Sequence, residues 1–226
     1  MRIGILGGTG PAGAALAVRL AAVGFEVIVG SRSKYRAMET ADQLLALWPG
    51  RRLEIGAGDN AGAADGDIVV IATPWDGATQ TAVSVDDHLR GKVVICMANA
   101  VTRIGKEFQP LVPPRGSVAA SVQAAVPQCM VAAAFHHVPA KELGDLGHPI
   151  ETDVLVCSDH PAATQTTSEI VAKIPNMRPL DAGGLSLATP IESFTAVLLQ
   201  LNVHYKTRVA LKFLGIPEAP APEPLG

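Results

Sequence analysis

The segment Gly7-Gly8-Thr9-Gly10-Pro11-Ala12-Gly13 decides the fold of this 226-residue chain. It follows an apolar-rich stretch, Arg2–Leu6, and precedes a run of small residues that ends at Val23. A strand, a turn with glycines at this spacing and a helix of small residues are typical of the first βα unit of a dinucleotide-binding fold. The sequence therefore predicts that a pyrophosphate lies on the N-terminus of the helix, whose first N–H groups have no intrahelical partners.

Each glycine has a separate task in this interpretation. Gly8 makes the turn, Gly10 lets the backbone approach a phosphate, and Gly13 lets the helix pack against the strand. Pro11 suits the first helical position, because its missing N–H would have no partner there. We expect the cofactor to contact the six consecutive residues Gly8, Thr9, Gly10, Pro11, Ala12 and Gly13.

The end of the second predicted strand selects the cofactor. The chain reads Gly30-Ser31-Arg32 where an NAD enzyme normally has Asp or Glu to bind the ribose hydroxyls. A hydroxyl and a guanidinium suit a phosphate dianion, and Arg36, one helical turn further on, adds a third contact. Ser31, Arg32 and Arg36 therefore predict NADP(H). The alternative is an arginine-rich helix start with solvated side chains.

Composition limits the other function classes. Hydrophobic residues make up 48% of the chain and charged residues 17%, which is typical of a protein with one substantial core. The net charge of −3 and the aromatic content of 4% argue against a nucleic-acid surface. The most hydrophobic segment, Ile191–Leu214, is interrupted by charged residues and is not expected to cross a membrane. Met1 leads directly into the first strand without a signal peptide, so we expect a cytoplasmic protein.

Strand-length apolar runs alternate with helix-length segments along the chain. This alternation predicts an α/β fold of the Rossmann type, with a doubly wound, mostly parallel sheet. We expect an NADP-binding Rossmann domain over residues 1–181, a small C-terminal helical domain over 182–216 and a proline-rich tail over 217–226. The predicted strands are Ile3–Leu6, Glu26–Val29, Leu53–Gly56, Ile68–Ala72, Val93–Met97, Met130–Phe135, Asp153–Cys157 and Arg178–Asp181.

A long C-terminal helix is predicted over Pro190–Leu214, with Gly215 as its cap. Its apolar residues occupy more than one face, which is too many for a helix that lies on one face of a sheet. The helix therefore needs a second burial surface. We expect a homodimer that forms through this helix, and the alternative is a central helix wrapped by its own domain.

The loop Thr73-Pro74-Trp75 follows the fourth predicted strand. In a dinucleotide site this loop passes beside the cofactor's ribose and nicotinamide, so Thr73, Pro74 and Trp75 are expected to contact them. The residues fit a second interpretation equally well, in which Thr73 caps the next helix and Trp75 packs against the core.

Asn99 and the pair His136-His137 follow the fifth and sixth strands and are expected to face the same crevice. Adjacent histidines on an extended chain project to opposite sides, and no acidic cluster accompanies them, so we predict no metal site. His136 is placed to position a bound ring or to donate a proton, and the alternative is a loop histidine bonded to the backbone. The chain has no Tyr-x-x-x-Lys pair, and sparse acid–base residues favour hydride transfer between two cofactors, which needs mainly proximity.

An ordered set of motifs extends across the whole chain. They are Gly-Gly-Thr-Gly-x-x-Gly at 7–13, Val-Gly-Ser-Arg at 29–32, Pro-Trp at 74–75, His-x-x-Pro-Ala at 136–140, Arg-Pro-Leu-Asp-Ala-Gly-x-Leu at 178–185, Glu-Ser at 192–193 and Lys-Phe-Leu-Gly-Ile at 212–216. In this order they resemble the NADPH-dependent reductases of the deazaflavin coenzyme F420, also called F420H2:NADP oxidoreductases.

The resemblance implies an oxidoreductase that transfers a hydride between NADP(H) and coenzyme F420 as co-substrate, usually as a homodimer. It gives the NADP-phosphate role to Thr9, Ser31, Arg32 and Arg36. It also places His136 and Val138 beside the stacked nicotinamide and deazaflavin rings.

Two other functions remain compatible with the residues. One is an NADP-dependent Rossmann reductase of a small imine, ketone or metal-chelate substrate, similar to the pyrroline-carboxylate reductases or to the cytosolic domain of membrane ferric reductases. The other is a non-catalytic NADP-sensing protein whose C-terminal helix contacts a partner protein.

Overall fold

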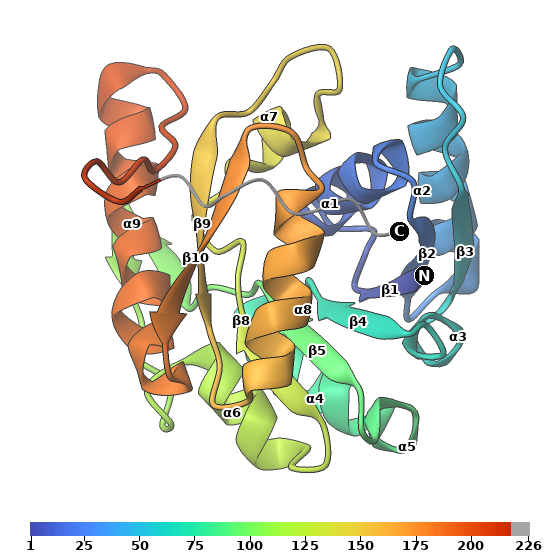
Figure 1. Cartoon of the computed structure of the whole chain (residues 1–226), viewed down its shortest axis with the longest axis horizontal. Coiled ribbons are helices and arrows are strands. Elements are labelled where there is room, and N and C mark those ends of the chain that lie inside the picture. Colours follow the sequence, from blue (N-terminus) through green and yellow to red (C-terminus); the bar gives the residue numbers. More distant parts are fainter. Residues whose placement is uncertain (218–226) are drawn as a thin grey trace.

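A sheet of eight strands runs through the computed structural model, which describes residues 1–217 (Figure 1). The strand order is β10-β9-β8-β5-β4-β1-β2-β3. The strands are β1 Arg2–Leu6, β2 Glu26–Ser31, β3 Ile55–Asp59, β4 Ile68–Ile71, β5 Val93–Cys96, β8 Met130–Ala133, β9 Thr152–Cys157 and β10 Met177–Gly183.

Six neighbouring strands, from β8 to β3, run parallel. Every residue of β4 and β5 is buried and apolar, as is typical of parallel strands that are covered on both faces. The chain crosses over between β1 and β4, and ligands of such sheets bind outside the carboxyl ends of the strands at this point. β9 runs antiparallel to β8, and β10 runs parallel to β9. The predicted α/β fold with a mostly parallel sheet is confirmed.

The core consists of two apolar clusters, one on each face of the sheet. The first cluster receives α1 Pro11–Ala22, α2 Lys34–Leu47, α7 Ala140–Gly144 and α8 Pro161–Ala172. The second receives α3 Asn60–Ala64, α4 Trp75–Val83, α5 Asp86–Leu89 and α6 Val118–Ala125. α4 and α5 are separate helices, because Val85 between them leaves the helical conformation (φ −129°) and is buried in the second cluster.

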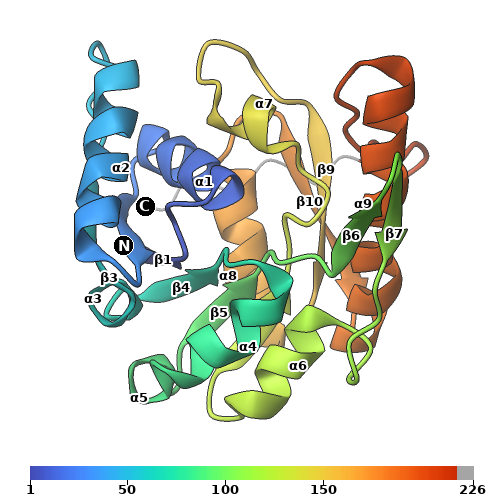
Figure 2. The same ribbon diagram turned by 180° about the vertical axis from the view of Figure 1, so that it is seen from behind.

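A β-hairpin that the sequence analysis did not predict follows β5. Its strands are β6 Val101–Ile104 and β7 Glu107–Pro110. Gly105 turns the chain with φ +62°, a conformation that glycine adopts without steric cost. The hairpin lies beside α9, Ala188–Tyr205, as Figure 2 shows, and Gln200 of α9 accepts a hydrogen bond from the Phe108 N–H at 3.2 Å.

The C-terminal helix is displaced from its predicted range of 190–214. A short 3-10 helix over 185–187 leads into α9, which ends at Tyr205. Lys206 ends the helix in the left-handed conformation (φ +52°), so the cap predicted at Gly215 is wrong. The proline-rich tail predicted over 217–226 lies outside the described residues apart from residue 217. No helix within residues 1–217 has the length and apolar character that crossing a bilayer requires.

The residues after α9 return to the sheet. The Leu211 carbonyl accepts a hydrogen bond from the Asp153 N–H of β9 at 2.8 Å, and the Phe213 N–H donates to the Asp153 carboxylate at 2.6 Å. Arg178 of β10 binds the same carboxylate through two hydrogen bonds of 2.8 and 2.6 Å. β10 continues to Gly183, across the boundary between residues 1–181 and 182–216, and that division into domains stays a prediction.

Candidate cofactor site

Backbone hydrogen bonds fix the turn between β1 and α1. The Gly8 N–H lies 3.1 Å from the Ile5 carbonyl and 2.8 Å from the Gly30 carbonyl, and the second bond joins the turn to the end of β2. Gly10 occupies the N-cap of α1 without a side-chain cap, and Pro11 is the first helical residue. Among residues 1–217 no side chain caps the first N–H groups of α1, so this helix N-terminus is available to a ligand.

Gly13 and Gly10 of this turn differ in what an added methyl group would meet. A methyl group on Gly13 would lie 2.9 Å from the Gly8 Cα, so packing inside the turn requires glycine there. A methyl group on Gly10 would meet its nearest neighbour at 3.5 Å, an ordinary contact, so the chain itself does not require this glycine. The open space at Gly10 fits a phosphate on the helix N-terminus. Thr9 and Ala12, both half-buried, belong to the same turn.

The end of β2 presents a hydroxyl and two guanidinium groups. Ser31 is 7% exposed, and its hydroxyl accepts a hydrogen bond from the N–H of Ser33, the N-cap of α2. Arg32 and Arg36 are exposed, and neither forms an ion pair with a carboxylate among residues 1–217. Asp59, the register partner of Ser31 on β3, already accepts an N–H from the first turn of α3. This arrangement suits a 2′-phosphate better than bare ribose hydroxyls.

Thr73 and Trp75, in the loop after β4, lie in two different environments. Thr73 lies against Gly7, where an added methyl group would come within 2.5 Å of the Thr73 Cγ2. The Thr73 Oγ1 is buried and has no hydrogen-bond partner among the described residues. Thr73 does not cap α4, because Pro74 occupies the N-cap position. Trp75 begins α4 and lines a separate cavity of about 420 Å³ against α6, so it lies apart from the cavity described next.

A cavity of about 250 Å³ lies between the N-terminus of α1, the exits of β5 and β8, and α9. Five residues predicted from the sequence meet in it: Ala12, Asn99, His136, His137 and Val138. We call this cavity the slot. It connects directly to the glycine turn, because Ala12 belongs to both.

His136 lines the slot as a neutral ring. The residue is 3% exposed, and neither ring nitrogen has a hydrogen-bond partner among the described residues. Burial, and to a smaller extent the adjacent His137, lower the pKa of His136 to about 3, although the backbone at Ala98 and Met97 offsets part of the effect. An unpartnered, buried and neutral imidazole fits a role in positioning a bound ring.

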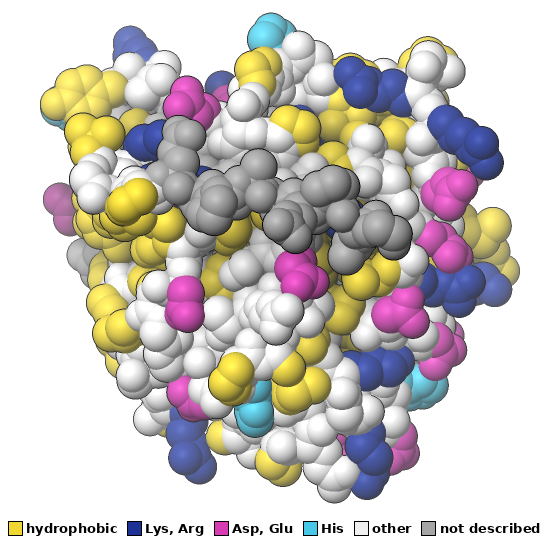
Figure 3. Space-filling model, viewed as in Figure 1, with side chains coloured by type: hydrophobic (Ala, Val, Ile, Leu, Met, Phe, Trp, Pro, Cys, Tyr) yellow, Lys and Arg dark blue, Asp and Glu magenta, His cyan; other side chains and the backbone are white. Residues whose placement is uncertain are grey.

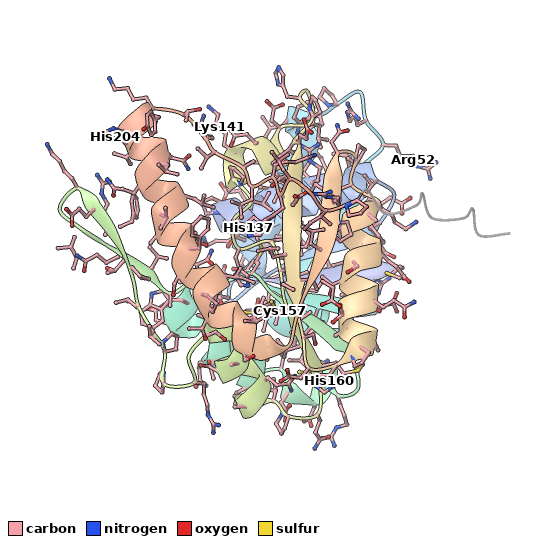
Figure 4. The ribbon with its side chains drawn as sticks, turned by 60° about the vertical axis from the view of Figure 1, so that its left-hand side comes forward. Arg52, His137, Lys141, Cys157, His160 and His204 are labelled. Carbon is pink, nitrogen blue, oxygen red and sulfur yellow. The ribbon has the colours of Figure 1, made fainter. Side chains whose placement is uncertain are left out.

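His137 is held in a different way. Its Nε2 lies 2.7 Å from the Asp153 carbonyl of β9, and its Nδ1 is buried without a partner among the described residues. Phe135 has φ +64°, so the chain turns here instead of continuing as the extended strand from which opposite orientations were expected. Figure 4 shows His137 inside the molecule, with Lys141 and His204 toward one end of α9. Within residues 1–217, no group of three or more metal-ligating side chains comes together.

Asn99 contributes mainly to the structure of the slot. Its Nδ2 donates a hydrogen bond of 2.8 Å to the His136 carbonyl, which ties the exit of β5 to the exit of β8. The far wall consists of α9 residues that the sequence analysis did not assign to the site, including Thr195, Leu198 and Asn202. No local motif marks them, because their contribution depends on how α9 docks.

Glu192 is a buried acid that joins α9 to α6. It is 3% exposed, and its carboxylate accepts hydrogen bonds from the N–H groups of Val118 at 2.8 Å and Ala119 at 3.1 Å. Burial raises the pKa of Glu192 to about 7, although both hydrogen bonds lower it. The sequence marked Glu192 only as part of a motif, and the structure shows that it binds the N-terminus of another helix.

Comparison with known proteins identifies the family. The family described as NADP oxidoreductase, coenzyme F420-dependent, matches residues 2–100. The F420-dependent NADP reductase of Methanocaldococcus jannaschii is 35% identical over 213 residues, which are 92% of this chain and 95% of that protein. This chain belongs to the F420-dependent NADP reductase family. The family's Methanothermobacter marburgensis member is 33% identical over 96% of this chain and 100% of its own length.

A crystal structure supports the same fold. A candidate F420-dependent NADP reductase from Arthrobacter sp. FB24 superimposes with a TM-score of 0.79 at 22% sequence identity, and covers 94% of this chain and all of its own. The resemblance drawn from the ordered motifs is confirmed at the level of the F420-dependent NADP reductase family by the relatives of 35% and 33% identity. The roles of the individual residues remain predictions from the geometry.

Proposed function

We propose that this protein transfers a hydride between NADP(H) and the deazaflavin coenzyme F420. The observation that carries the proposal is the slot, which begins at Ala12 on the phosphate-binding end of α1 and continues to His136, Val138 and α9. A nicotinamide bound through this helix would extend into the same cavity, where a second planar ring also has access. Membership in the F420-dependent NADP reductase family supports F420 as that second ring.

The NADP half uses the features at the ends of β1 and β2. The open N-terminus of α1 and the space at Gly10 would bind the pyrophosphate, with Thr9 and Pro11 in the same turn. Ser31, Arg32 and Arg36 would bind the 2′-phosphate, because both guanidinium groups lack carboxylate partners in the described chain.

The slot favours transfer between two cofactors over reduction of an imine or ketone. Such a reduction needs a group that protonates the substrate near neutral pH. The described lining contains no Asp, Glu, Lys or Tyr, and the low pKa of His136 keeps that ring neutral. Burial also lowers the pKa of His137, the other histidine of the lining. When bound, NADPH and F420 supply the hydride donor and acceptor; the protein orients the two rings and excludes water from them. The buried Oγ1 of Thr73, which has no hydrogen-bond partner in the described part of the chain, is placed to hydrogen-bond the bound nicotinamide nucleotide.

The test is acceptor identity. The protein is mixed with NADPH and F420, and the loss of the deazaflavin absorbance is followed. A pyrroline-type imine and a ferric chelate are tested as the other acceptors. Reduction of F420, but of neither the imine nor the ferric chelate, supports the proposal. Turnover of the imine or the chelate, without turnover of F420, refutes it, and NADPH binding without any turnover indicates a sensor.

We also propose that the protein is a cytoplasmic homodimer, with residues 182–216 on the dimer side. Apolar side chains on α9 face outward at helical spacing: Phe194 is 43% exposed and Val197 is 47% exposed, with the half-buried Leu201 on the same face. Figure 3 shows hydrophobic side chains gathered on the side where α9 lies. A second copy of this helix would remove these side chains from water.

A further inference from the structure

The hydroxyl of Thr195 makes a contact that the proposed reaction has not yet used. Thr195 lies on α9, is 7% exposed and lines the slot. Its Oγ1 is 3.2 Å from the His136 carbonyl and 3.2 Å from the Asn99 Oδ1. One hydroxyl proton serves one of these acceptors at a time, so the group is shared between them. The His136 carbonyl can therefore accept two hydrogen bonds, one from the Asn99 Nδ2 and one from the Thr195 hydroxyl.

The backbone at His136 needs such anchors. Phe135 precedes it in the left-handed region at φ +64°, which is a strained conformation for a bulky residue. The Val138 N–H closes the turn with a hydrogen bond of 3.2 Å to the Phe135 carbonyl. The His136 imidazole has no hydrogen bond of its own among the described residues. The direction of the ring is therefore set by packing and by whatever holds its backbone.

We propose that Thr195 is a positioning residue, which holds the His136 carbonyl through its hydroxyl and so aims the His136 ring into the slot. This inference rests on the proposed function. It gives α9 a role beyond walling the cavity, because Thr195 is the contact through which the helix reaches the β8 exit and, by way of Asn99, the β5 exit. A change of a few tenths of an ångström at this carbonyl would change the ring's position against the bound cofactors.

The experiment distinguishes the effect of the Thr195 hydroxyl from the effect of the side chain's shape. Thr195→Val keeps the shape and removes the donor, Thr195→Ala removes the donor without adding volume, and Thr195→Ser keeps the donor. Thr189→Val on the same helix is the matched control, because the Thr189 hydroxyl lies against Gly116 and does not line the slot. For each variant the kcat with F420, the Kd and KM for NADPH and the melting temperature are measured.

We expect T195V and T195A to lower kcat about tenfold, because the His136 carbonyl then keeps only the hydrogen bond from Asn99 and the ring is held less firmly in its reactive position. The Kd for NADPH and the melting temperature are expected to stay near wild type, because α1 and the end of β2 bind that cofactor. T195S is expected to restore kcat to within about twofold of wild type, and T189V to behave like wild type.

Three results would overturn the inference: unchanged kcat in T195V and T195A, T195S as slow as T195V, or parallel losses of kcat, NADPH affinity and stability. Insoluble Val and Ala variants would show a purely structural role and overturn it as well. Failure of the wild-type protein to reduce F420 refutes the proposed function instead. The two failures are therefore distinguishable.

Discussion

Replacement of Gly10 by alanine is expected to damage cofactor binding while leaving the fold intact. The added methyl group would meet its nearest protein neighbour, the Gly7 carbonyl oxygen, at 3.5 Å. The backbone at Gly10 has φ −76° and ψ 161°, which alanine also adopts. The cost to stability is limited to the weaker N-capping of alanine, about 1 kcal/mol. The methyl group would, however, occupy the space where a phosphate approaches the helix N-terminus.

The expected loss of affinity follows from the contact that is blocked. A hydrogen bond between a backbone N–H and a charged group contributes about 1.5–3 kcal/mol. Its loss corresponds to a rise in the Kd for NADPH of roughly 10- to 150-fold. The assay is a titration of the protein with NADPH, followed by nicotinamide fluorescence, beside urea unfolding of the ligand-free protein.

Gly13→Ala provides the contrast. Its methyl group would lie 2.9 Å from the Gly8 Cα and 3.0 Å from the Ala72 Cβ, so the turn has to shift. Overpacking of this kind costs about 1–3 kcal/mol in stability. We expect G13A to lower the free energy of unfolding more than G10A does. If G10A binds NADPH as tightly as wild type, the assignment of this turn to the pyrophosphate is refuted.

Three further predictions test the cofactor, the buried acid and the dimer. Arg32→Ala is expected to raise the KM for NADPH at least tenfold more than that for NADH, with the exposed Arg52→Ala as control; equal effects on the two constants contradict the 2′-phosphate assignment. Because burial raises the pKa of Glu192 from its ordinary 4.5 to about 7, the folded state binds an extra proton between these pH values. Wild-type stability should therefore fall by roughly 3 kcal/mol as pH rises through that window. Urea unfolding of Glu192→Gln should show a smaller fall of stability with pH. The same pH dependence in both proteins would contradict the assignment of the extra proton to Glu192. Val197→Asp is expected to yield a monomer in light scattering, whereas Val83→Asp, at a similarly exposed site, should not; an unchanged V197D dimer excludes this face.

The sequence was sufficient for the parts of the fold that depend on local pattern. Apolar runs such as Val93–Cys96 and the glycine turn specify a parallel sheet with helices on both faces, and the structure has both. The direction of β9 depends on pairing with β8, which is a long-range property. Gly105, which separates two strand-length segments, could have indicated the β6–β7 hairpin. Those segments are only partly apolar, so the hydrophobic pattern did not predict them as strands.

The slot was predictable where its residues lie at the carboxyl ends of parallel strands. Asn99, His136 and Val138 follow β5 and β8, so the topology alone brings them together. Trp75 begins the helix after β4, but its side chain lines the cavity against α6. Thr195 was not predicted, because its place in the slot depends on the docking of α9 against both strand exits.

The end of α9 shows how a distant buried charge overrides local helix propensity. The apolar run predicted a helix as far as Leu214, whereas α9 ends at Tyr205. Asp153 is fully buried, and burial opposes its charge, yet the Arg178 guanidinium and the Phe213 N–H hold its pKa below the usual range. The Phe213 N–H can reach this carboxylate only if the chain leaves the helix and returns along β9. Arg178 already pairs with this carboxylate, and the Phe213 N–H adds a further charged hydrogen bond of about 1.5–3 kcal/mol, compared with well under about 1 kcal/mol for one helix residue, so the contact favours an end of α9 before residue 213.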